Sequence, residues 1–266
     1  MPAFRPDRAL TMALSGILVD AGVNAMRHRG RAEARLKADR SPVSLADEEG
    51  EAIILRGLKQ EAGEIAVVSE EASERGLPPQ LPSCFFLLDP LDGTKEFLNG
   101  HDDFTVNLAL VDDGAPVFGI IYAPARRALY FTGGQKAWCA SPIGGREDLH
   151  RTPVRTLRMR TPPADGLDMV ASRSHAGDEE AQMRTRYTIR GTKAAGSSLK
   201  FCLLAEGEAD LYPRLGPTME WDIAAGHAIL LAAGGTLAQW DGAPLRYGKL
   251  ETGLKNSGFL AKHPTL

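Results

Sequence analysis

The segment Asp89–Thr94, with the sequence Asp-Pro-Leu-Asp-Gly-Thr, places two carboxylates three residues apart in a turn. Its proline fixes the backbone and its glycine permits a tight bend, so Asp89 and Asp92 can face one point with the Leu91 carbonyl between them. Carboxylate and carbonyl oxygens that converge in this way are the ligands that Mg²⁺ prefers. The same turn, taken alone, also fits an ordinary hydrogen-bonded loop.

Two further acids stand where they could join this turn. Glu70 follows the β-branched run Ile65–Val68, and Asp222 follows Trp221 at the start of an expected helix. Taken singly, Glu70 fits a solvated surface acid and Asp222 fits a helix cap. Because two apolar strands stop at carboxylates and a helix starts at another, we interpret the four acids together as one metal-binding constellation.

Apolar periodicity and turn residues outline the elements that position these acids. Residues 9–21 predict an amphipathic helix, because their apolar side chains recur at helical spacing. The same run also resembles the core of a signal peptide, but it lacks a clean small-residue cleavage site. Ser44, with Asp47 three residues later, predicts the start of a second helix that runs to about Gln60.

The later elements form two groups. Strand-like runs separated by turn residues predict an antiparallel meander, and beyond it strands alternate with helices. The polar, proline-containing stretch 141–167 lies between the groups, so we expect an N-terminal α+β metal-binding subdomain (1–150) and a C-terminal α/β substrate-binding subdomain (151–266). The expected strands are 65–68, 84–88, 104–111, 116–122, 128–132, 169–171 and 209–212, and the expected later helices are 197–205 and 222–233.

The composition narrows the class of protein. The 266 residues carry a formal net charge of −3, which argues against a protein that coats a nucleic-acid polymer. Three cysteines without a CxxC pair fit reduced thiols in a cytoplasmic protein. No apolar run approaches the ~20 residues of a membrane span. The basic segment Arg27–Lys37 fits plain solvation, with peripheral contact to the inner membrane face as the alternative.

Four motifs, Lys37–Asp47, Val68–Glu71, Asp89–Thr94 and Trp221–Gly226, share one further property. In order and spacing they resemble the lithium-sensitive, magnesium-dependent phosphatases, which include inositol monophosphatases, fructose-1,6-bisphosphatases and 3′(2′),5′-bisphosphate nucleotidases. The resemblance implies an α/β fold of the inositol monophosphatase or sugar phosphatase type. That fold is a layered α/β/α/β/α sandwich with the site between two subdomains.

Within this superfamily, Lys95–Phe97, Gly196–Cys202 and Ala205–Arg214 resemble the bacterial bisphosphate nucleotidases. The resemblance implies magnesium-dependent hydrolysis of the 3′-phosphate of adenosine 3′,5′-bisphosphate (PAP) to AMP and phosphate, which recycles PAP in sulfur assimilation. An inositol monophosphatase or a fructose-1,6-bisphosphatase-like sugar phosphatase is the alternative enzyme. A catalytically silent protein that senses a nucleotide or a metal is the alternative of another class.

The resemblance also assigns the metal ligands, which are all oxygen donors. Two or three Mg²⁺ ions and inhibition by Li⁺ are implied. The chemistry is consistent with a phosphate monoester dianion, which repels hydroxide until metals neutralise its charge. The first ion would be held by Glu70, Asp89 and the Leu91 carbonyl, and the second by Asp89, Asp92 and Asp222.

Asp47 and Thr94 resemble the pair that orients and deprotonates the attacking water, with Glu70 as the third catalytic residue. The partner would be a small nucleotide bisphosphate, and the chain would be a monomer or a homodimer. Lys200 also fits an ordinary helix-surface charge and His175 a plain loop residue. The implied substrate-binding residues are Glu70, Leu91, Asp92, Gly93, Thr94, His175, Gly196, Ser197, Lys200, Arg214 and Asp222.

Overall fold

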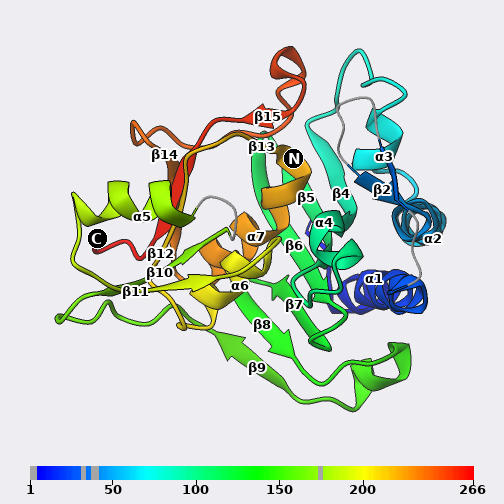
Figure 1. Cartoon of the computed structure of the whole chain (residues 1–266). Coiled ribbons are helices and arrows are strands. Elements are labelled where there is room, and N and C mark those ends of the chain that lie inside the picture. The colour runs from blue at the N-terminus through cyan, green and yellow to red at the C-terminus, as the bar shows by residue number, and fades with distance from the viewer. Residues whose placement is uncertain (1–4, 31–33, 37–41, 173–175) are drawn as a thin grey trace.

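The computed structural model describes residues 5–30, 34–36, 42–172 and 176–266. Layers of helix and sheet alternate through the molecule (Figure 1). Helices α1 (Arg8–His28) and α2 (Leu45–Ala62) pack on a seven-stranded sheet, which α7 (Glu220–Ala232) also contacts. Helix α6 (Leu199–Ala205) packs against α7 and a five-stranded sheet, and α5 (Ala176–Arg184) lies on that second sheet. This order is the expected α/β/α/β/α sandwich.

The seven-stranded sheet has the order β3-β4-β5-β6-β7-β8-β9. Strands β3 and β4 pair in parallel, and every later pair is antiparallel, so the expected meander is confirmed. The strands are β3 (Ala66–Ser69), β4 (Cys84–Asp92), β5 (Thr105–Asp112), β6 (Ala115–Ala123), β7 (Ala128–Gly133), β8 (Lys136–Ala140) and β9 (Val154–Leu157).

The five-stranded sheet has the order β11-β10-β12-β16-β14 and mixes parallel with antiparallel pairs. Its strands are β10 (Leu167–Ala171), β11 (Ile189–Ala194), β12 (Leu211–Arg214), β14 (Thr236–Gln239) and β16 (Phe259–Lys262). The short elements are β1 (Ala34–Leu36), β2 (Pro42–Ser44), α3 (Glu70–Ser73), α4 (Thr94–Leu98), η1 (Arg146–His150), β13 (Thr218–Met219), η2 (Leu250–Thr252) and β15 (Lys255–Asn256).

Strand β4 is buried on both faces, because its side chains alternate between two cores. Phe86 and Leu88 belong to the cluster under α1 and α2, whereas Phe85 and Leu87 belong to the cluster around α6 and α7. The sheet can approach α7 closely at Gly119, where a Cβ atom would lie 2.4 Å from a backbone carbonyl of that helix. Helix α7 therefore lies directly on the sheet that carries the acidic turn.

Several boundaries differ from those expected. The stretch 141–167 contains η1 and the strand β9, which pairs with β8 and extends the first sheet to Leu157. The passage to the second sheet therefore lies between Leu157 and Leu167, while the division into two subdomains at residue 150 stays a prediction. Helix α7 begins at Glu220, two residues before the expected start. In the two main sheets, the elements that the sequence did not predict are β8, β9, β11, β14, β16 and the helix α5, which are all short.

Helix α1 is, among the described residues, the one helix long and apolar enough to cross a membrane. Of its most apolar stretch, 56% is buried inside the protein. Leu14 and Leu18 are fully buried in the core between α1 and the sheet. Packing against the sheet therefore accounts for the apolar face of this helix.

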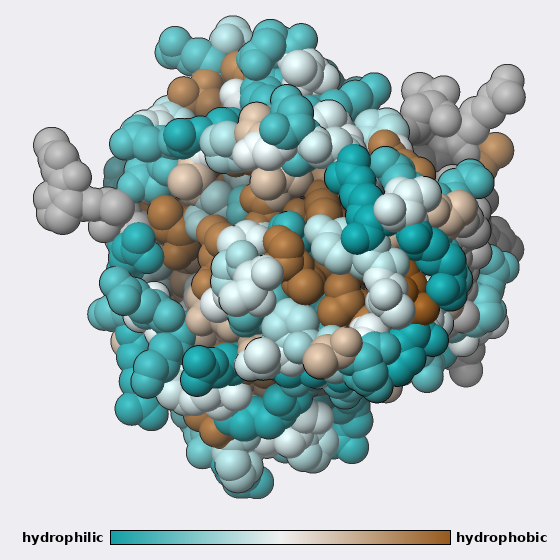
Figure 2. All heavy atoms as spheres, turned by 90° about the vertical axis from the view of Figure 1, so that its left-hand side faces the viewer, coloured by the Kyte–Doolittle hydropathy of each residue, from teal (hydrophilic) through white to brown (hydrophobic). Residues whose placement is uncertain are grey.

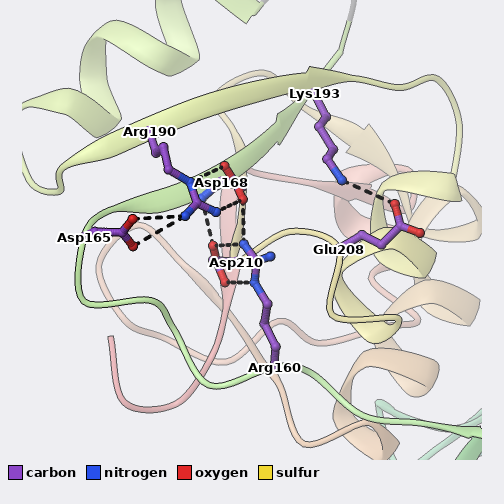
Figure 3. A network of polar contacts seen from close by, with 7 residues as sticks. All are labelled: Arg160, Asp165, Asp168, Arg190, Lys193, Glu208 and Asp210. Atoms are coloured by element: carbon purple, nitrogen blue, oxygen red, sulfur yellow. Dashed lines mark hydrogen bonds and ion pairs between the residues drawn. The ribbon is translucent and has the colours of Figure 1, made fainter.

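A network of ion pairs ties the second sheet together (Figure 3). Arg160 donates to both carboxylate oxygens of Asp210, at 2.8 and 2.7 Å, and to Asp168 at 2.7 Å. Asp210 is fully buried, and Arg190 also pairs with Asp168. These hydrogen bonds from Arg190 and Arg160 lower the pKa of Asp168 to about 2. A second pair in the view joins Lys193 to Glu208.

Figure 2 presents the side of the molecule that carries α5, where hydrophilic residues form most of the rim and apolar residues lie between them. A small core lies beneath this helix, built from residues such as Met169, Met183 and Leu260. Tyr187 and Trp240 are partly buried and pack against it. This core contains fewer buried residues than either of the two cores around the first sheet.

Candidate active site

The acidic turn links the end of β4 to the start of α4. Gly93 adopts φ 89°, and a Cβ atom there would lie 2.9 Å from the Asp103 carbonyl, so this bend requires glycine. Within the turn, the Leu91 N–H donates to Asp89 Oδ1 over 3.0 Å. Asp89 is 1% exposed and the backbone holds its side chain. The tight bend that the sequence predicts at Gly93 is therefore present.

Glu70 reaches the same region because β3 and β4 are parallel neighbours. Ser69 pairs with Leu88, so Glu70, which follows the end of β3, comes beside Asp89 of β4. The carboxyl ends of adjacent parallel strands always meet at one edge of a sheet. The pairing of these two strands therefore brings together two acids that are 19 positions apart in the chain.

Asp222 approaches from the opposite side, in the first turn of α7. Its Oδ2 accepts a hydrogen bond of 2.8 Å from the Met219 N–H, so it caps its helix as the simpler interpretation expected. It also lies near the acidic turn, because the charges of Asp92 and Glu70 raise its pKa. Asp222 therefore caps its helix and also belongs to the acidic cluster.

The electrostatics place the four acids in one cluster. Burial raises the pKa of Asp89, and the charges of Glu70, Asp92 and Asp222 raise it further. Burial likewise raises the pKa of Asp222, followed by the charges of Asp92 and Glu70. A divalent cation would offset this repulsion, and the all-oxygen donor set is chemically suited to Mg²⁺.

The acids are not arranged as a finished metal site. Among the described residues, no group of three or more histidine, cysteine or acidic side chains is close enough to hold an ion. The carboxylates lie within electrostatic reach of one another, and backbone N–H groups hold Asp89, Asp92 and Asp222 at separate positions. The ligand set expected from the sequence therefore stays a prediction.

Asp47 and Thr94 form the hydrogen-bonded pair that the resemblance implies. The Thr94 hydroxyl lies 3.0 Å from Asp47 Oδ1 and 3.2 Å from the Leu91 carbonyl. The other carboxylate oxygen, Asp47 Oδ2, accepts from the N–H and the hydroxyl of Ser44 at 2.8 and 2.7 Å. This is the expected capping box of α2. The helix cap fixes Asp47 with one oxygen and leaves the other for Thr94.

The loop before α6 carries Gly196 and Ser197 to the turn. A Cβ atom on Gly93 would lie 3.3 Å from Ser197 Cβ, so the two segments touch. The Gly196 N–H donates to Asp103 Oδ2 over 3.2 Å. Ser197 adopts φ 54° and its hydroxyl is hydrogen-bonded to that of Thr105. The structure thus brings these two expected substrate contacts beside the acidic cluster.

Lys200 is neither a surface charge nor an exposed cation. It is 5% exposed, and its ammonium donates to the Ser197 carbonyl over 2.7 Å and lies over the Tyr212 ring. Burial lowers the pKa of this ammonium, and the charge of Asp92 opposes that effect. In this structure Lys200 supports the loop that carries Ser197.

Arg214 ends β12 and is half-buried beside the cluster. Its charge lowers the pKa of Asp222, in opposition to the burial and repulsion that raise it. Its Nε atom is buried and has no hydrogen-bond partner among the described residues. The expected contact His175 lies outside the described residues.

Two further residues, Asn107 and Ser198, belong to the cluster and were missed by sequence reasoning. Both are 1% exposed and hydrogen-bonded to Asp92. The available signal was an asparagine at a central position of the apolar run 104–111, where a polar side chain needs a partner. Ser198 gave no signal of its own beside Ser197.

A cavity of about 1440 Å³ lies elsewhere, between the start of α1 and residues 131–154. Its lining includes Met12, Trp138 and Leu149 but none of the expected site residues. Asp7 is the one acid in its described lining, so the acidic cluster lies outside this cavity.

Comparison with known proteins places this site in a family. Residues 12–264 match the model of the inositol monophosphatase family. The chain is 44% identical to the 3′(2′),5′-bisphosphate nucleotidase CysQ of Salmonella typhimurium, over 84% of this chain and 86% of that protein. It is 38% identical to CysQ of Buchnera aphidicola, over 85% and 82% of the two chains.

Solved structures agree. The crystal structure of CysQ from Bacteroides thetaiotaomicron matches with a TM-score of 0.79 and 34% identity, over 96% of this chain and 97% of that one. An inositol monophosphatase from Anabaena shares the fold, with a TM-score of 0.71 and 23% identity over 96% and 90% of the chains. This chain belongs to the inositol monophosphatase family.

Proposed function

We propose that this protein hydrolyses the 3′-phosphate of adenosine 3′,5′-bisphosphate to give AMP and phosphate. The observation that carries the proposal is the meeting of the acidic turn with the Asp47–Thr94 pair at one edge of the sheet. Relatives that are 44% identical over most of their length are named 3′(2′),5′-bisphosphate nucleotidases, which supports a nucleotide over a sugar phosphate. The reaction would serve PAP recycling in sulfur assimilation.

The metal ligands in this proposal are Glu70, Asp89, the Leu91 carbonyl, Asp92 and Asp222. When bound, two or three Mg²⁺ ions would neutralise the phosphate charge and lower the pKa of a bound water. Inhibition by Li⁺ is part of the proposal because the family resemblance implies it. The electrostatic repulsion at Asp89 and Asp222 supports this assignment, since a cation is the simplest charge to offset it.

Asp47 and Thr94 would position the attacking water. When the Thr94 hydroxyl donates its single proton to Asp47 Oδ1, its lone pairs are left to accept a hydrogen bond from that water. As the water attacks, it would give a proton to Thr94 Oγ while Thr94 passes its own proton to Asp47 Oδ1. Ser44 supports this role because it holds Asp47 Oδ2 with two hydrogen bonds and so keeps Oδ1 aimed at Thr94.

The rest of the nucleotide would contact the loop before α6 and the end of β12. Gly93, Gly196, Ser197 and Arg214 are the proposed contacts, and His175 completes the set from outside the described residues. A second phosphate needs a cation that a singly phosphorylated sugar does not. Arg214 is suited to this role, because its buried Nε has no partner among the described residues. Lys200 would support the loop that carries Ser197, through its hydrogen bond to the Ser197 carbonyl.

We infer a cytoplasmic setting with reduced thiols. Within the described residues Cys84, Cys139 and Cys202 are free, and burial raises the pKa of the Cys139 thiol to about 11 and also that of Cys202. High thiol pKa values make these cysteines poor nucleophiles, so they are packing residues. Whether the chain works as a monomer or a homodimer can be measured by sedimentation.

A side-by-side assay tests the proposal. Phosphate release is measured from adenosine 3′,5′-bisphosphate, inositol 1-phosphate and fructose 1,6-bisphosphate, each with and without Mg²⁺. We expect the nucleotide to have the highest kcat/KM, to yield AMP, and to require Mg²⁺. A higher kcat/KM for either sugar phosphate would replace this proposal with the sugar phosphatase alternative. The silent sensing protein would be favoured if no substrate released phosphate.

A further inference from the structure

We propose that Ser198 and Asn107 are positioning residues that set the separation of Asp92 and Asp222, and thereby tune the affinity of the site for Mg²⁺. The inference rests on the proposed function, because Asp92 and Asp222 are ligands in that proposal. It concerns two residues that are expected to touch neither metal nor substrate. Each lies on a different element from both acids, so the four side chains join β4, β5, α7 and the loop before α6.

Ser198 contacts both acids at once. Its N–H donates to Asp92 Oδ2 over 2.7 Å, and its hydroxyl donates to the Asp222 carbonyl over 2.7 Å. Asp92 ends β4 and Asp222 lies in the first turn of α7. One residue therefore bridges the sheet and the helix from which the two carboxylates project.

Asn107 closes the arrangement from β5. Its Nδ2 donates to Asp92 Oδ2 over 3.2 Å and to Ser198 Oγ over 3.0 Å. Asn107 pairs with Asp89 across the β4–β5 ladder, and the register shifts between Asp89 and Asp92. This irregularity turns Asp92 toward Asn107 instead of continuing the regular alternation of side chains.

The direction of each hydrogen bond follows from the groups. The Asp222 carbonyl can only accept, and Asp92 Oδ2 already accepts from the Ser198 N–H, so Asn107 presents its amide nitrogen and Ser198 gives its hydroxyl proton to Asp222. The Ser198 oxygen is then left to accept from Asn107. The result is one directional chain, from Asn107 through Ser198 to Asp222, in which both donated protons have a single possible assignment.

The chain leaves one buried acceptor unsatisfied. Asn107 Oδ1 is buried and has no hydrogen-bond partner among the described residues. An orphaned buried acceptor is unfavourable, and a similarly shaped apolar residue would avoid it. Asparagine at this place is therefore better explained by what its amide nitrogen holds than by stability. Groups that orient metal ligands in this way influence metal affinity by about 10- to 100-fold.

The test measures Mg²⁺ binding by calorimetry on the substrate-free protein, for wild type, Ser198→Ala and Asn107→Leu. We expect the Kd for Mg²⁺ to rise about 10- to 100-fold in each variant. Turnover of adenosine 3′,5′-bisphosphate should recover toward the wild-type value at saturating Mg²⁺. Because the residues act as one chain, the double variant should bind Mg²⁺ little more weakly than either single variant.

Thr132→Val is the matched control. The Thr132 hydroxyl is buried and accepts from the Gly119 N–H over 3.0 Å, in the same sheet but away from the acids. This variant should lose stability and keep the wild-type Kd for Mg²⁺. An unchanged Kd in Ser198→Ala and Asn107→Leu, or an equal rise in Thr132→Val, would overturn the inference while leaving the proposed function standing. Absence of Mg²⁺ binding by wild type would instead overturn the proposed metal site and this inference with it.

Discussion

The Thr94 hydroxyl lies 3.0 Å from Asp47 Oδ1, although 47 positions separate the two residues in the chain. Thr94 opens α4 after the acidic turn, and Asp47 lies in the first turn of α2. Asp47 is 2% exposed, whereas Thr94 is partly exposed. In the proposed function this carboxylate would take up a proton from the Thr94 hydroxyl.

Asp47→Asn should lower kcat by about 10²- to 10⁴-fold, because the amide cannot take up a proton from Thr94. The Kd for Mg²⁺ should stay near the wild-type value, since Asp47 is outside the proposed ligand set. Single-turnover kinetics and calorimetry measure the two effects separately. Thr94→Ser keeps the hydroxyl and should retain most activity, whereas Thr94→Val should not. Near-wild-type turnover in Asp47→Asn would remove this residue from the mechanism.

Arg214→Ala should raise KM for adenosine 3′,5′-bisphosphate far more than KM for a nucleoside 3′-monophosphate. The reason is that a guanidinium beside the cluster can pair with the second phosphate, which the monophosphate lacks. Steady-state kinetics with both substrates measure the ratio. Arg214→Lys keeps the charge without the forked geometry of the guanidinium. The ratio of the two KM values should therefore lie between those of wild type and Arg214→Ala. Equal increases for both substrates would make Arg214 a structural residue.

His227 should make the protein less stable as the pH falls from 6.5 to 4. Burial lowers its pKa to about 4, so over this range the unfolded chain binds a proton that the folded protein excludes. The loss should reach about 3 kcal/mol near pH 4. Urea unfolding of wild type and His227→Gln at pH 7 and 4.5 measures it.

The Gln variant keeps a hydrogen-bonding group toward the Tyr247 hydroxyl, which lies 2.8 Å from His227 Nδ1. The free energy of unfolding of this variant should depend less on pH than that of wild type between pH 6.5 and 4.5. The buried acids Asp89 and Asp222 contribute equally to both proteins, so their effect cancels in the difference. If the free energy of unfolding fell equally with pH in the two proteins, His227 would not be the group that causes the loss of stability.

Arg160→Ala should destabilise the second sheet by about 3 kcal/mol, because Asp210 is fully buried and would lose its bidentate partner. Thermal unfolding at pH 7 measures the change. Arg190→Ala is the comparison. Because Arg190 is partly exposed, its removal should destabilise the protein less than removal of Arg160. Loss of stability should appear without a change in KM, because the network lies away from the acidic turn. Equal effects of both variants would contradict this ranking.

The ion pairs of Asp168 predict a second, more acidic transition. The pKa of Asp168 is about 2. The stability that its ion pairs contribute is therefore complete above pH 4 and is lost as the pH falls through 2. In Arg190→Ala the hydrogen bond that contributes most to this low pKa is gone. Acid unfolding followed by circular dichroism should therefore begin at higher pH in that variant than in wild type.

The sequence alone determined the local chemistry of the site. The turn at Asp89–Thr94 follows from its proline and glycine, and the cap formed by Ser44 and Asp47 follows from a spacing of three residues. These features depend on neighbours in the chain, so their residue types suffice to predict them. The resemblance added the family, the layered fold and the reaction class, which the comparisons confirm at the level of the family.

Tertiary structure alone decided which groups meet. The parallel pairing of β3 with β4 brings Glu70 to Asp89. The packing of α7 against the same sheet brings Asp222 to them. Ser198 lies 106 positions from Asp92, and Lys200, expected as a surface or substrate-facing cation, is buried under its own loop. Such contacts depend on which apolar faces are buried against each other across the whole chain. No local pattern of residues contains that information.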